Sequence, residues 1–260
     1  MNPYIDSLFS INNRNVVITG GGGHLCSEMA RGLAKAGCNV AVLDLRKEKA
    51  DAVAEEISTD FKIKALGYEV DASKKNELQE VCTKISAEFG KIDILINGAG
   101  INSSTPFFEI TEEEYFNVLN SQITSTFLCC QVFGNSMFKN KKGSIINISS
   151  ASAGPPLSRA FVYSFSKAGI KNLTQNLGRE WAQNGIRVNA IRPGFFPTEW
   201  NKKNFITKDR ENSILNHTPM NRYGEVSELV GAIIYLASDA SSFVTGSELF
   251  VDGGFSCMTV

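Results

Sequence analysis

Histidine is scarce in this chain of 260 residues, which holds only His24 and His217. A histidine-rich zinc site is therefore excluded, because such a site needs several imidazole ligands. The cysteines lack a CxxC spacing and are scattered through apolar segments, at Cys26, Cys38, Cys82, Cys129, Cys130 and Cys257. This distribution suits buried free thiols in a reducing compartment, and we expect none of them to bind a metal.

A long hydrophobic run and a dominant charge are also missing. No apolar stretch approaches the roughly 18 residues of a membrane-spanning helix, and residues 1–15 lack a basic start followed by an apolar segment. The 26 basic and 27 acidic residues leave a net charge of −1, which gives nucleic acid or an anionic membrane nothing to bind. We therefore expect a soluble, cytoplasmic protein without a nucleic-acid or membrane partner.

The chain does contain an alternation of short β-branched runs with amphipathic segments. The expected strands are 15–19, 39–43, 64–70, 93–97, 144–148, 187–191 and 248–251, and the expected helices are 25–36, 47–58, 75–89, 112–138, 160–184 and 226–237. This order predicts an α/β fold, a Rossmann-type doubly wound parallel sheet with helices on both faces. No linker or repeat interrupts it, so we expect a single domain over residues 1–260.

Four consecutive glycines, Gly20 to Gly23, follow the first expected strand. In a doubly wound sheet ligands bind beyond the carboxyl ends of the strands, so the residues there carry the functional information. A flexible turn leading into a helix can hold a pyrophosphate through backbone N–H groups. We expect phosphate contacts at Gly20, Gly22, Gly23, His24 and Leu25; a plain turn is the alternative.

Acidic residues follow the second and third expected strands. Asp44 can accept both hydroxyls of an adenosine ribose and repel a 2′-phosphate, which favours NAD over NADP. Arg46, two residues later, argues in the opposite direction. Asp71 can meet the adenine amine. Either aspartate can instead cap the helix that follows it.

Small residues and a rigid turn follow the fourth and sixth expected strands. Asn97-Gly98-Ala99-Gly100 lets the backbone approach a ligand closely, and we expect Asn97 and Ala99 to contact the cofactor. The turn Pro193 to Thr198 offers a threonine that can bind a carboxamide, so Pro193 and Thr198 join the expected cofactor contacts.

Tyr163 and Lys167 stand four residues apart in an expected helix, which places both side chains on one face. An ammonium beside a phenol favours the ionised phenol, and such a tyrosine can act as a general acid or base. Ser150, which follows the fifth expected strand, can hold a substrate oxygen while the tyrosine donates a proton to it. A chance pair on a solvated helix face is the alternative.

Together, these residues resemble the short-chain dehydrogenase/reductase family over the chain from about Phe9 to the C-terminus. The motifs that carry the resemblance are Thr19-Gly20, Asn97-Gly98-Ala99-Gly100, Ser150, Tyr163 with Lys167, Arg187-Val188-Asn189, Pro193-Gly194 and Val251-Asp252-Gly253-Gly254. The resemblance implies a nicotinamide dinucleotide cofactor and a homotetramer paired through the two long helices and the last strand. It also implies that Tyr163 transfers the proton, that Lys167 lowers the tyrosine pKa and holds the nicotinamide ribose, and that Ser150 orients the carbonyl.

The chain departs from the family pattern at two places. The glycine motif TGxxxGxG would place glycines where His24 and Cys26 stand, so Cys26 must fit where a helix packs against a strand. The family asparagine that supports a water relay to the lysine is replaced by Gln122, which carries the same amide on a longer stem. We therefore count Gln122 with the catalytic residues.

The segment 195–223 has the polar, irregular character of a substrate lid. Cations there, and Arg159 before the catalytic helix, suit an anionic, hydroxyl-rich substrate, although solvated lid charges are the alternative. We expect substrate contacts at Ser150, Ser152, Arg159, Trp200 and Asn201. Residues 20–26, 193–201 and 217–220 resemble the sugar-acid branch of the family, of the mannonate oxidoreductase and gluconate dehydrogenase type. The 101–106 loop is shorter than in the mannonate oxidoreductases, so a different sugar or sugar acid is the alternative substrate.

We therefore expect an NAD(H)-dependent oxidoreductase that interconverts a secondary alcohol and a ketone on a sugar or sugar acid. A 3-oxoacyl thioester reductase is the rival enzyme, and Asp44 argues against it because that activity normally uses a phosphorylated cofactor. A catalytically silent, dinucleotide-sensing protein is a third reading, suggested by His24, Cys26 and Gln122.

Overall fold

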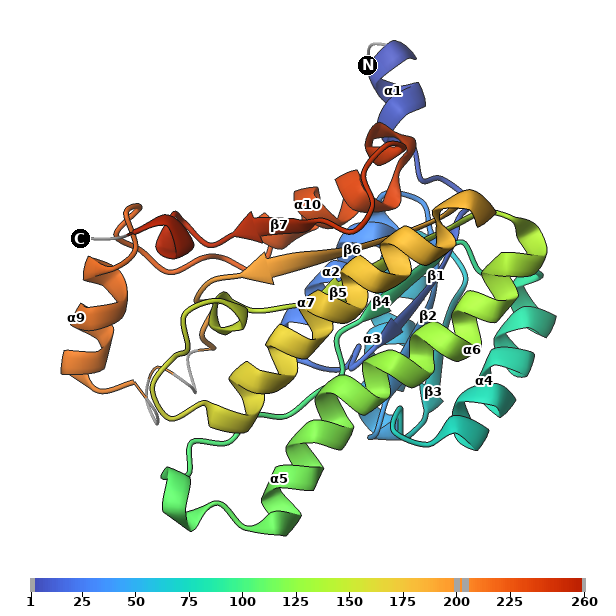
Figure 1. Cartoon of the computed structure of the whole chain (residues 1–260). Coiled ribbons are helices and arrows are strands. Elements are labelled where there is room, and N and C mark those ends of the chain that lie inside the picture. The colour runs from blue at the N-terminus through green and yellow to red at the C-terminus, as the bar shows by residue number, and fades with distance from the viewer. Residues whose placement is uncertain (1–2, 199–201, 203–205, 259–260) are drawn as a thin grey trace.

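The computed structural model describes residues 3–198, 202 and 206–258. Within these residues seven parallel strands form one sheet in the order β3-β2-β1-β4-β5-β6-β7 (Figure 1). The strands are β1 Asn15–Thr19, β2 Asn39–Asp44, β3 Ala65–Glu69, β4 Ile94–Asn97, β5 Gly143–Ile148, β6 Ile186–Pro193 and β7 Glu248–Val251. The strand order reverses between β1 and β4, the position at which doubly wound folds bind ligands. The predicted fold class is confirmed.

Helices cover both faces of the sheet (Figure 1). One face carries α2 His24–Lys35, α3 Lys47–Phe61 and α10 Glu228–Ala237, and the other carries α4 Lys75–Phe89, α6 Ser125–Asn140 and α7 Phe161–Trp181. A hydrophobic core lies on each side of the sheet, and successive residues of a strand point into opposite cores. In β1, Val16 and Ile18 pack under α2, whereas Val17 packs on the α6 side. A short helix, α1 Pro3–Phe9, projects from the body and buries none of its residues.

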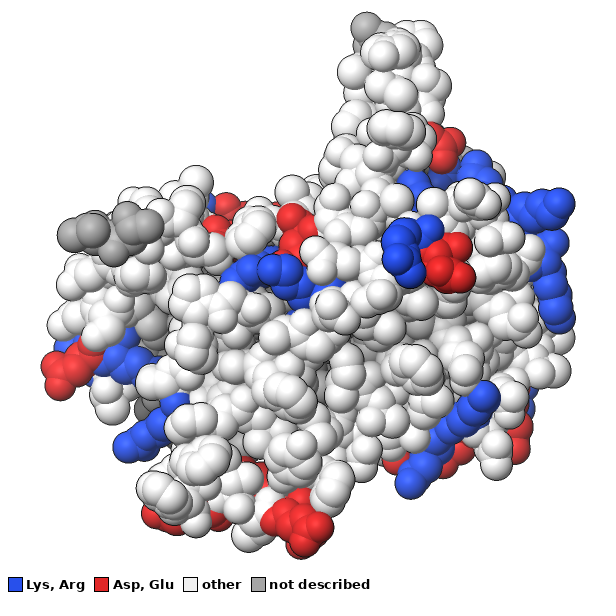
Figure 2. Space-filling model, in the orientation of Figure 1, with Lys and Arg blue, Asp and Glu red and all other residues white. Residues whose placement is uncertain are grey.

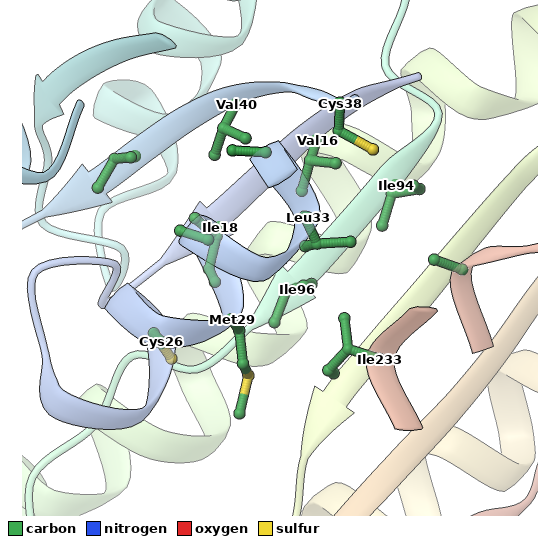
Figure 3. Packing of buried hydrophobic residues seen from close by; sticks show 14 of the residues in the cluster. Val16, Ile18, Cys26, Met29, Leu33, Cys38, Val40, Ile94, Ile96 and Ile233 are labelled. Atoms are coloured by element: carbon green, nitrogen blue, oxygen red, sulfur yellow. The ribbon is translucent and has the colours of Figure 1, made fainter. Parts of the chain in front are cut away.

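Helix α2 is held to the sheet by a stripe of apolar residues. Met29 and Leu33 are fully buried and lie over Val16, Ile18 and the neighbouring strands (Figure 3). Burying a leucine side chain contributes about 1.5–3 kcal/mol, so this stripe fixes where the helix begins beside the glycine turn. Cys26, near the start of α2, points into the same packing.

The expected continuous helix over 112–138 is wrong in its middle. It consists of α5 Glu112–Leu119, a π-helical turn at Asn120–Thr124, and α6. The hydroxyls of Ser125 and Thr126 both donate to the Gln122 carbonyl, at 3.1 and 2.7 Å. Hydroxyls that bond to carbonyls of the preceding turn compete with the helical ladder, and we attribute the widened turn to them.

The segment 195–223 is more regular than the sequence suggested. It contains α9 Lys208–Asn216, which begins after Thr207, and the Thr207 side chain accepts a hydrogen bond from the Arg210 backbone N–H. Trp200 and Asn201, two expected substrate contacts, lie outside the described residues.

Two further expectations concern cysteine and the membrane. All six cysteines are free thiols, but only four are buried; Cys82 is half-buried and Cys257 is exposed, which corrects the expectation for these two. In the described ranges, no helix combines the length and apolarity needed to cross a bilayer.

Candidate active site

A cleft of about 1250 Å³ lies at the carboxyl ends of the strands. It extends from Asp44 and Asp71, after β2 and β3, to Tyr163 and Lys167 on α7. The expected site residues that line it are Gly20, Gly23, His24, Leu25, Asp44, Asp71, Ala99, Gln122, Ser150, Arg159, Tyr163 and Lys167. The structure thus brings together residues that are separated by more than half of the chain.

The glycine turn is shaped by close backbone contacts. Gly20 has a φ of +65°, and a β-carbon there would lie 2.8 Å from the Ala99 Cα, so no other residue fits. Gly23 and His24 place the N-terminus of α2 in the cleft wall. Gly22 does not line the cleft but lies against the Asp44 carboxylate. The backbone N–H groups of Gly21, Gly22 and Gly23 are bonded within the protein, so a pyrophosphate would meet the N-terminus of α2, where His24 and Leu25 line the cleft.

Asp44 is held in place by the backbone around it. Its carboxylate is only 7% exposed and accepts hydrogen bonds from the Gly22 and Arg46 backbone N–H groups, both at 3.1 Å. The Arg46 Nε lies 3.5 Å from it. Asp71 also lines the cleft, and it accepts hydrogen bonds from the backbone and hydroxyl of Ser73. Asp71 therefore caps its turn and faces the cleft at once.

Ser150 and Tyr163 form the centre of the site. Burial raises the pKa of Tyr163 above that of a free phenol, and the nearby Ser150 side chain partly offsets this effect. Ser150 also accepts hydrogen bonds from the backbone and the hydroxyl of Ser152, both at 3.2 Å. Ser152 is itself buried, so it orients Ser150 and does not line the cleft.

Lys167 lies beside the tyrosine, with its Nζ 5.4 Å from the Tyr163 ring centroid. Its ammonium is buried and donates a 2.6 Å hydrogen bond to the Ile148 carbonyl. Burial lowers the pKa of Lys167 to about 8. The lowering of the tyrosine pKa by Lys167 stays a prediction; in this structure burial raises that pKa and the Ser150 side chain opposes the increase.

Gln122 faces the cleft from the π-helical turn, but its side-chain amide bonds to the neighbouring 100–101 loop. The Nε2 donates to the Ile101 carbonyl at 2.8 Å, and the side chain fills the space that a β-carbon at Gly100 would need. Within the described part of the chain, the buried Oε1 has no hydrogen-bond partner. Its backbone carbonyl is occupied by the Ser125 and Thr126 hydroxyls, so Gln122 supports the 100–101 loop and makes no bond to Lys167 in this arrangement.

Asn97 has a role that the sequence did not indicate. Its side chain points into the interior and donates to the Asn147 Oδ1 at 2.8 Å, and Asn147 donates to the Thr174 hydroxyl at 2.8 Å. This buried chain of polar groups ties β4 to β5 and to α7, the helix that carries Tyr163. The available signal was Asn147 itself, an amide within the otherwise apolar stretch Ser144 to Ile148.

The end of β6 and the turn after it provide fewer of the expected cleft-lining residues than the sequence predicted. Pro193 ends β6 and is buried, and Gly194 takes its place in the cleft wall. Thr198 is described but is not among the lining residues. Helix α9 contributes Arg210 and Ile214 to the wall instead, and Ile214 was not expected from the sequence.

Cys26 replaces a family glycine and is accommodated by another glycine. The Cys26 Sγ lies 2.2 Å from the position that a β-carbon at Gly98 would take, so the thiol fits only because residue 98 has no side chain. Burial raises the pKa of Cys26 to about 12, against an opposing effect of Lys167. The thiol therefore packs as a small neutral group at the floor of the cleft.

A nucleotide-binding cleft at the switch point of a doubly wound sheet, with a serine, a tyrosine and a lysine at one end, defines a dinucleotide-dependent oxidoreductase. The family model described as enoyl-(acyl carrier protein) reductase matches residues 25–256. The chain belongs to the short-chain dehydrogenase/reductase family and is an oxidoreductase that acts on CH–OH groups.

Several relatives that match nearly the whole chain carry the names of enzymes that act on sugar acids. The chain is 36% identical to 2-dehydro-3-deoxy-D-gluconate 5-dehydrogenase of Formosa agariphila over 95% of this chain and 94% of the relative. Among solved structures, it resembles a putative D-mannonate oxidoreductase from Haemophilus influenza with bound NAD, at 38% identity, a TM-score of 0.91 and coverage of 96% and 97%. It also resembles a gluconate 5-dehydrogenase from Burkholderia cenocepacia in complex with NADP and tartrate, at 32% identity, a TM-score of 0.92 and coverage of 97% and 99%.

A relative with the rival activity is similar over nearly the same length. The chain is 31% identical to the 3-oxoacyl-[acyl-carrier-protein] reductase of Staphylococcus epidermidis, over 93% of this chain and 98% of that protein.

Proposed function

We propose that this protein is an NAD-preferring dehydrogenase that interconverts a secondary alcohol and a ketone on a sugar acid. The observation that carries the proposal is the placement of Ser150 and Tyr163, with Lys167 beside the tyrosine, in the cleft that also contains Asp44. A bound dinucleotide supplies the acceptor or donor for the hydride at the carbinol carbon. The residues of this chain handle the oxygen and its proton.

In the proposed mechanism the substrate oxygen lies between Ser150 and Tyr163. During reduction the Tyr163 hydroxyl gives its proton to the substrate oxygen and becomes a phenolate, and during oxidation this phenolate takes the proton of the substrate hydroxyl on its Oη. Ser150, oriented by Ser152, donates a hydrogen bond to the same oxygen as charge develops on it. Lys167 keeps a positive charge beside the phenol below a pH of about 8. It would also hold the nicotinamide ribose.

The preference for NAD rests on Asp44. A carboxylate at this position accepts hydrogen bonds from ribose hydroxyls and repels a phosphate placed there. Of the two similar structures, one was solved with NAD and the other with NADP. Family membership therefore does not decide between the two cofactors, and we base the preference on Asp44. Arg46 is already engaged by Asp44, which reduces its use as a phosphate ligand.

We further propose a cytoplasmic homotetramer of single-domain subunits in which 195–223 covers the substrate. Exposed aromatic side chains gather on η1 (Phe107–Glu109), α5, α6 and α7, at Phe107, Tyr115, Phe116, Phe127, Phe161 and Phe165. The face that carries α6 and α7 has few charged side chains over these helices (Figure 2). An exposed apolar surface of this kind is typical of a subunit interface. Light scattering should give four times the monomer mass, and Phe165→Asp should lower it.

The experiment that tests the proposed function is a turnover screen with NAD and NADP. Hexonates and their keto forms, neutral polyols and ketoses, and 3-oxoacyl thioester analogues are compared by initial rate. Activity with NAD on a hexonate or keto-hexonate is the expected result. NADPH-dependent activity confined to the thioester would overturn the proposal in favour of the acyl reductase, and the absence of turnover on every substrate would favour a silent sensing protein.

A further inference from the structure

The nine arginines of the chain differ in their partners. Six form ion pairs with a carboxylate: Arg14, Arg31, Arg46, Arg179, Arg192 and Arg222. Arg187 donates to the Leu236 and Ser238 carbonyls and to the Ser241 hydroxyl. Among the residues that the structure describes, no carboxylate pairs with Arg159 or Arg210.

Both of these arginines line the cleft that contains Tyr163. Arg159 lies in the loop immediately before α7, four residues before Tyr163, and Arg210 lies on α9. The Arg210 Nη1 is 3.4 Å from the Ser158 hydroxyl, so its guanidinium reaches the residue next to Arg159. Arg210, from a distant part of the chain, thus lies beside the loop that carries Arg159.

The backbone holds both residues in this position. Arg159 has a φ of +56°, a left-handed conformation that is costly for a residue with a β-carbon and persists only where surrounding structure imposes it. Arg210 is followed one turn later by Ile214, which is buried and lines the same cleft. Helix α9 therefore turns this face toward the cleft, while Lys208 and Glu211 pair with each other.

The carboxylates of the cleft wall lie at one end of the cleft, where Arg46 also lines it and lies beside Asp44. Its two lining carboxylates among the described residues are Asp44 and Asp71, which follow β2 and β3. At the end that contains Tyr163, the lining charges are Arg159, Arg210 and the buried Lys167, which already bonds a carbonyl. An anion is attracted to this end, and arginine offers a carboxylate two parallel hydrogen bonds.

We infer that Arg159 and Arg210 form the carboxylate subsite of the substrate. This inference rests on the proposed function, because it assigns the acid group of a sugar acid to these side chains and the reacting carbinol to Ser150 and Tyr163. The acid end is anchored away from the reacting carbon. The two arginines then select which hydroxyl along the sugar chain reaches Tyr163, so they determine specificity without touching the reacting atoms.

The test compares a charged ligand with a neutral one of the same length. D-Gluconate, D-mannonate and 5-keto-D-gluconate are titrated into the protein saturated with NADH or NAD by calorimetry, with D-glucitol and D-fructose as neutral counterparts. The variants are Arg159→Gln, Arg210→Gln and the double substitution. Arg179→Gln is the matched control, because Arg179 is exposed and pairs with Glu180 outside the cleft. Steady-state kcat and KM are measured on every substrate that turns over.

Each cleft variant should weaken hexonate binding about 10-fold to 100-fold, the effect of one charge-assisted hydrogen bond, and should raise KM more than it lowers kcat. Binding of the neutral ligand and of NADH should stay within about twofold of wild type, as should every value for Arg179→Gln. Equal losses for acid and neutral ligands, or unchanged hexonate binding, would overturn the inference. Wild-type protein that binds no hexonate would overturn it as well, and turnover of neutral sugars in that case would show that the oxidoreductase chemistry stands without the acid subsite.

Discussion

Cys26 and Gly98 share one volume at the floor of the cleft, since the cysteine sulfur lies 2.2 Å from the place of a β-carbon at residue 98. Gly98→Ala should therefore destabilise the protein by about 1–3 kcal/mol through overpacking. Cys26→Ala removes the sulfur and should recover most of that loss in the double variant. Chemical unfolding of the four proteins measures the coupling. Additive effects of the two substitutions would show that the side chains do not compete for this space.

Lys167 gives a pH dependence of stability with a definite sign. Its pKa is lowered to about 8 in the folded protein from 10.5, so between these values the unfolded chain binds more protons and stability rises with pH. The free energy of unfolding of wild type, relative to Lys167→Met, should increase by up to about 3 kcal/mol across this range. Lys139→Met, on the exposed end of α6, should give no such difference; a flat profile for both variants would contradict the burial of the Lys167 charge.

Arg192 and Glu248 form a buried ion pair behind Ser150, with side chains 5% and 8% exposed. Arg192 also donates to the Ala151 carbonyl, and Glu248 accepts from the Ser149 hydroxyl, so the pair holds both chain neighbours of Ser150 in place. Arg192→Ala should cost about 3–5 kcal/mol, because it leaves a buried carboxylate behind.

The double variant Arg192→Met with Glu248→Leu should be more stable than Arg192→Ala, because it buries no charge. Thermal unfolding and kcat are measured together. A stable Arg192→Ala protein with wild-type kcat would show that the pair supports neither the fold nor Ser150.

Asp44 should decide between the two dinucleotides. Asp44→Asn removes the charge that repels a 2′-phosphate, so the ratio of NADPH to NADH affinity should rise about 10-fold, equivalent to about 1.4 kcal/mol. Asp51→Asn is the control, because Asp51 lies on α3 outside the cleft and pairs with Lys47. Fluorescence titration of both cofactors measures the ratio, and an unchanged ratio in Asp44→Asn would remove the argument for NAD.

The succession of strands and helices along the chain, and the place of the cleft at the carboxyl ends of the strands, follow from the sequence, because β-branched runs and the residues after them are local signals. The expected strand Asn15–Thr19 and helix Lys75–Phe89 agree with the structure at both ends. Local sequence patterns do not predict the position of a side chain when that position depends on a residue far away in the sequence. The burial of Asn97 depends on Asn147, and the fit of Cys26 depends on Gly98.

The π-helical turn shows a second kind of limit. The apolar periodicity of 112–138 fits one helix, and the widening at Asn120–Thr124 coincides with two hydroxyls bonding to a carbonyl. Periodicity reports which face is buried and carries no information on such bonds. The same holds for Arg159 and Arg210, whose shared place in the cleft wall requires the fold.

The most direct test of the account is the turnover of Tyr163→Phe on the best sugar-acid substrate, measured with a parallel NADH titration. Phenylalanine keeps the ring but cannot move a proton, so kcat should fall by at least about 100-fold, while the NADH dissociation constant and the melting temperature stay close to wild type. Tyr115→Phe, on α5 outside the cleft, should retain full activity. A Tyr163→Phe protein with wild-type kcat would contradict the central claim that this tyrosine carries the proton of the reaction.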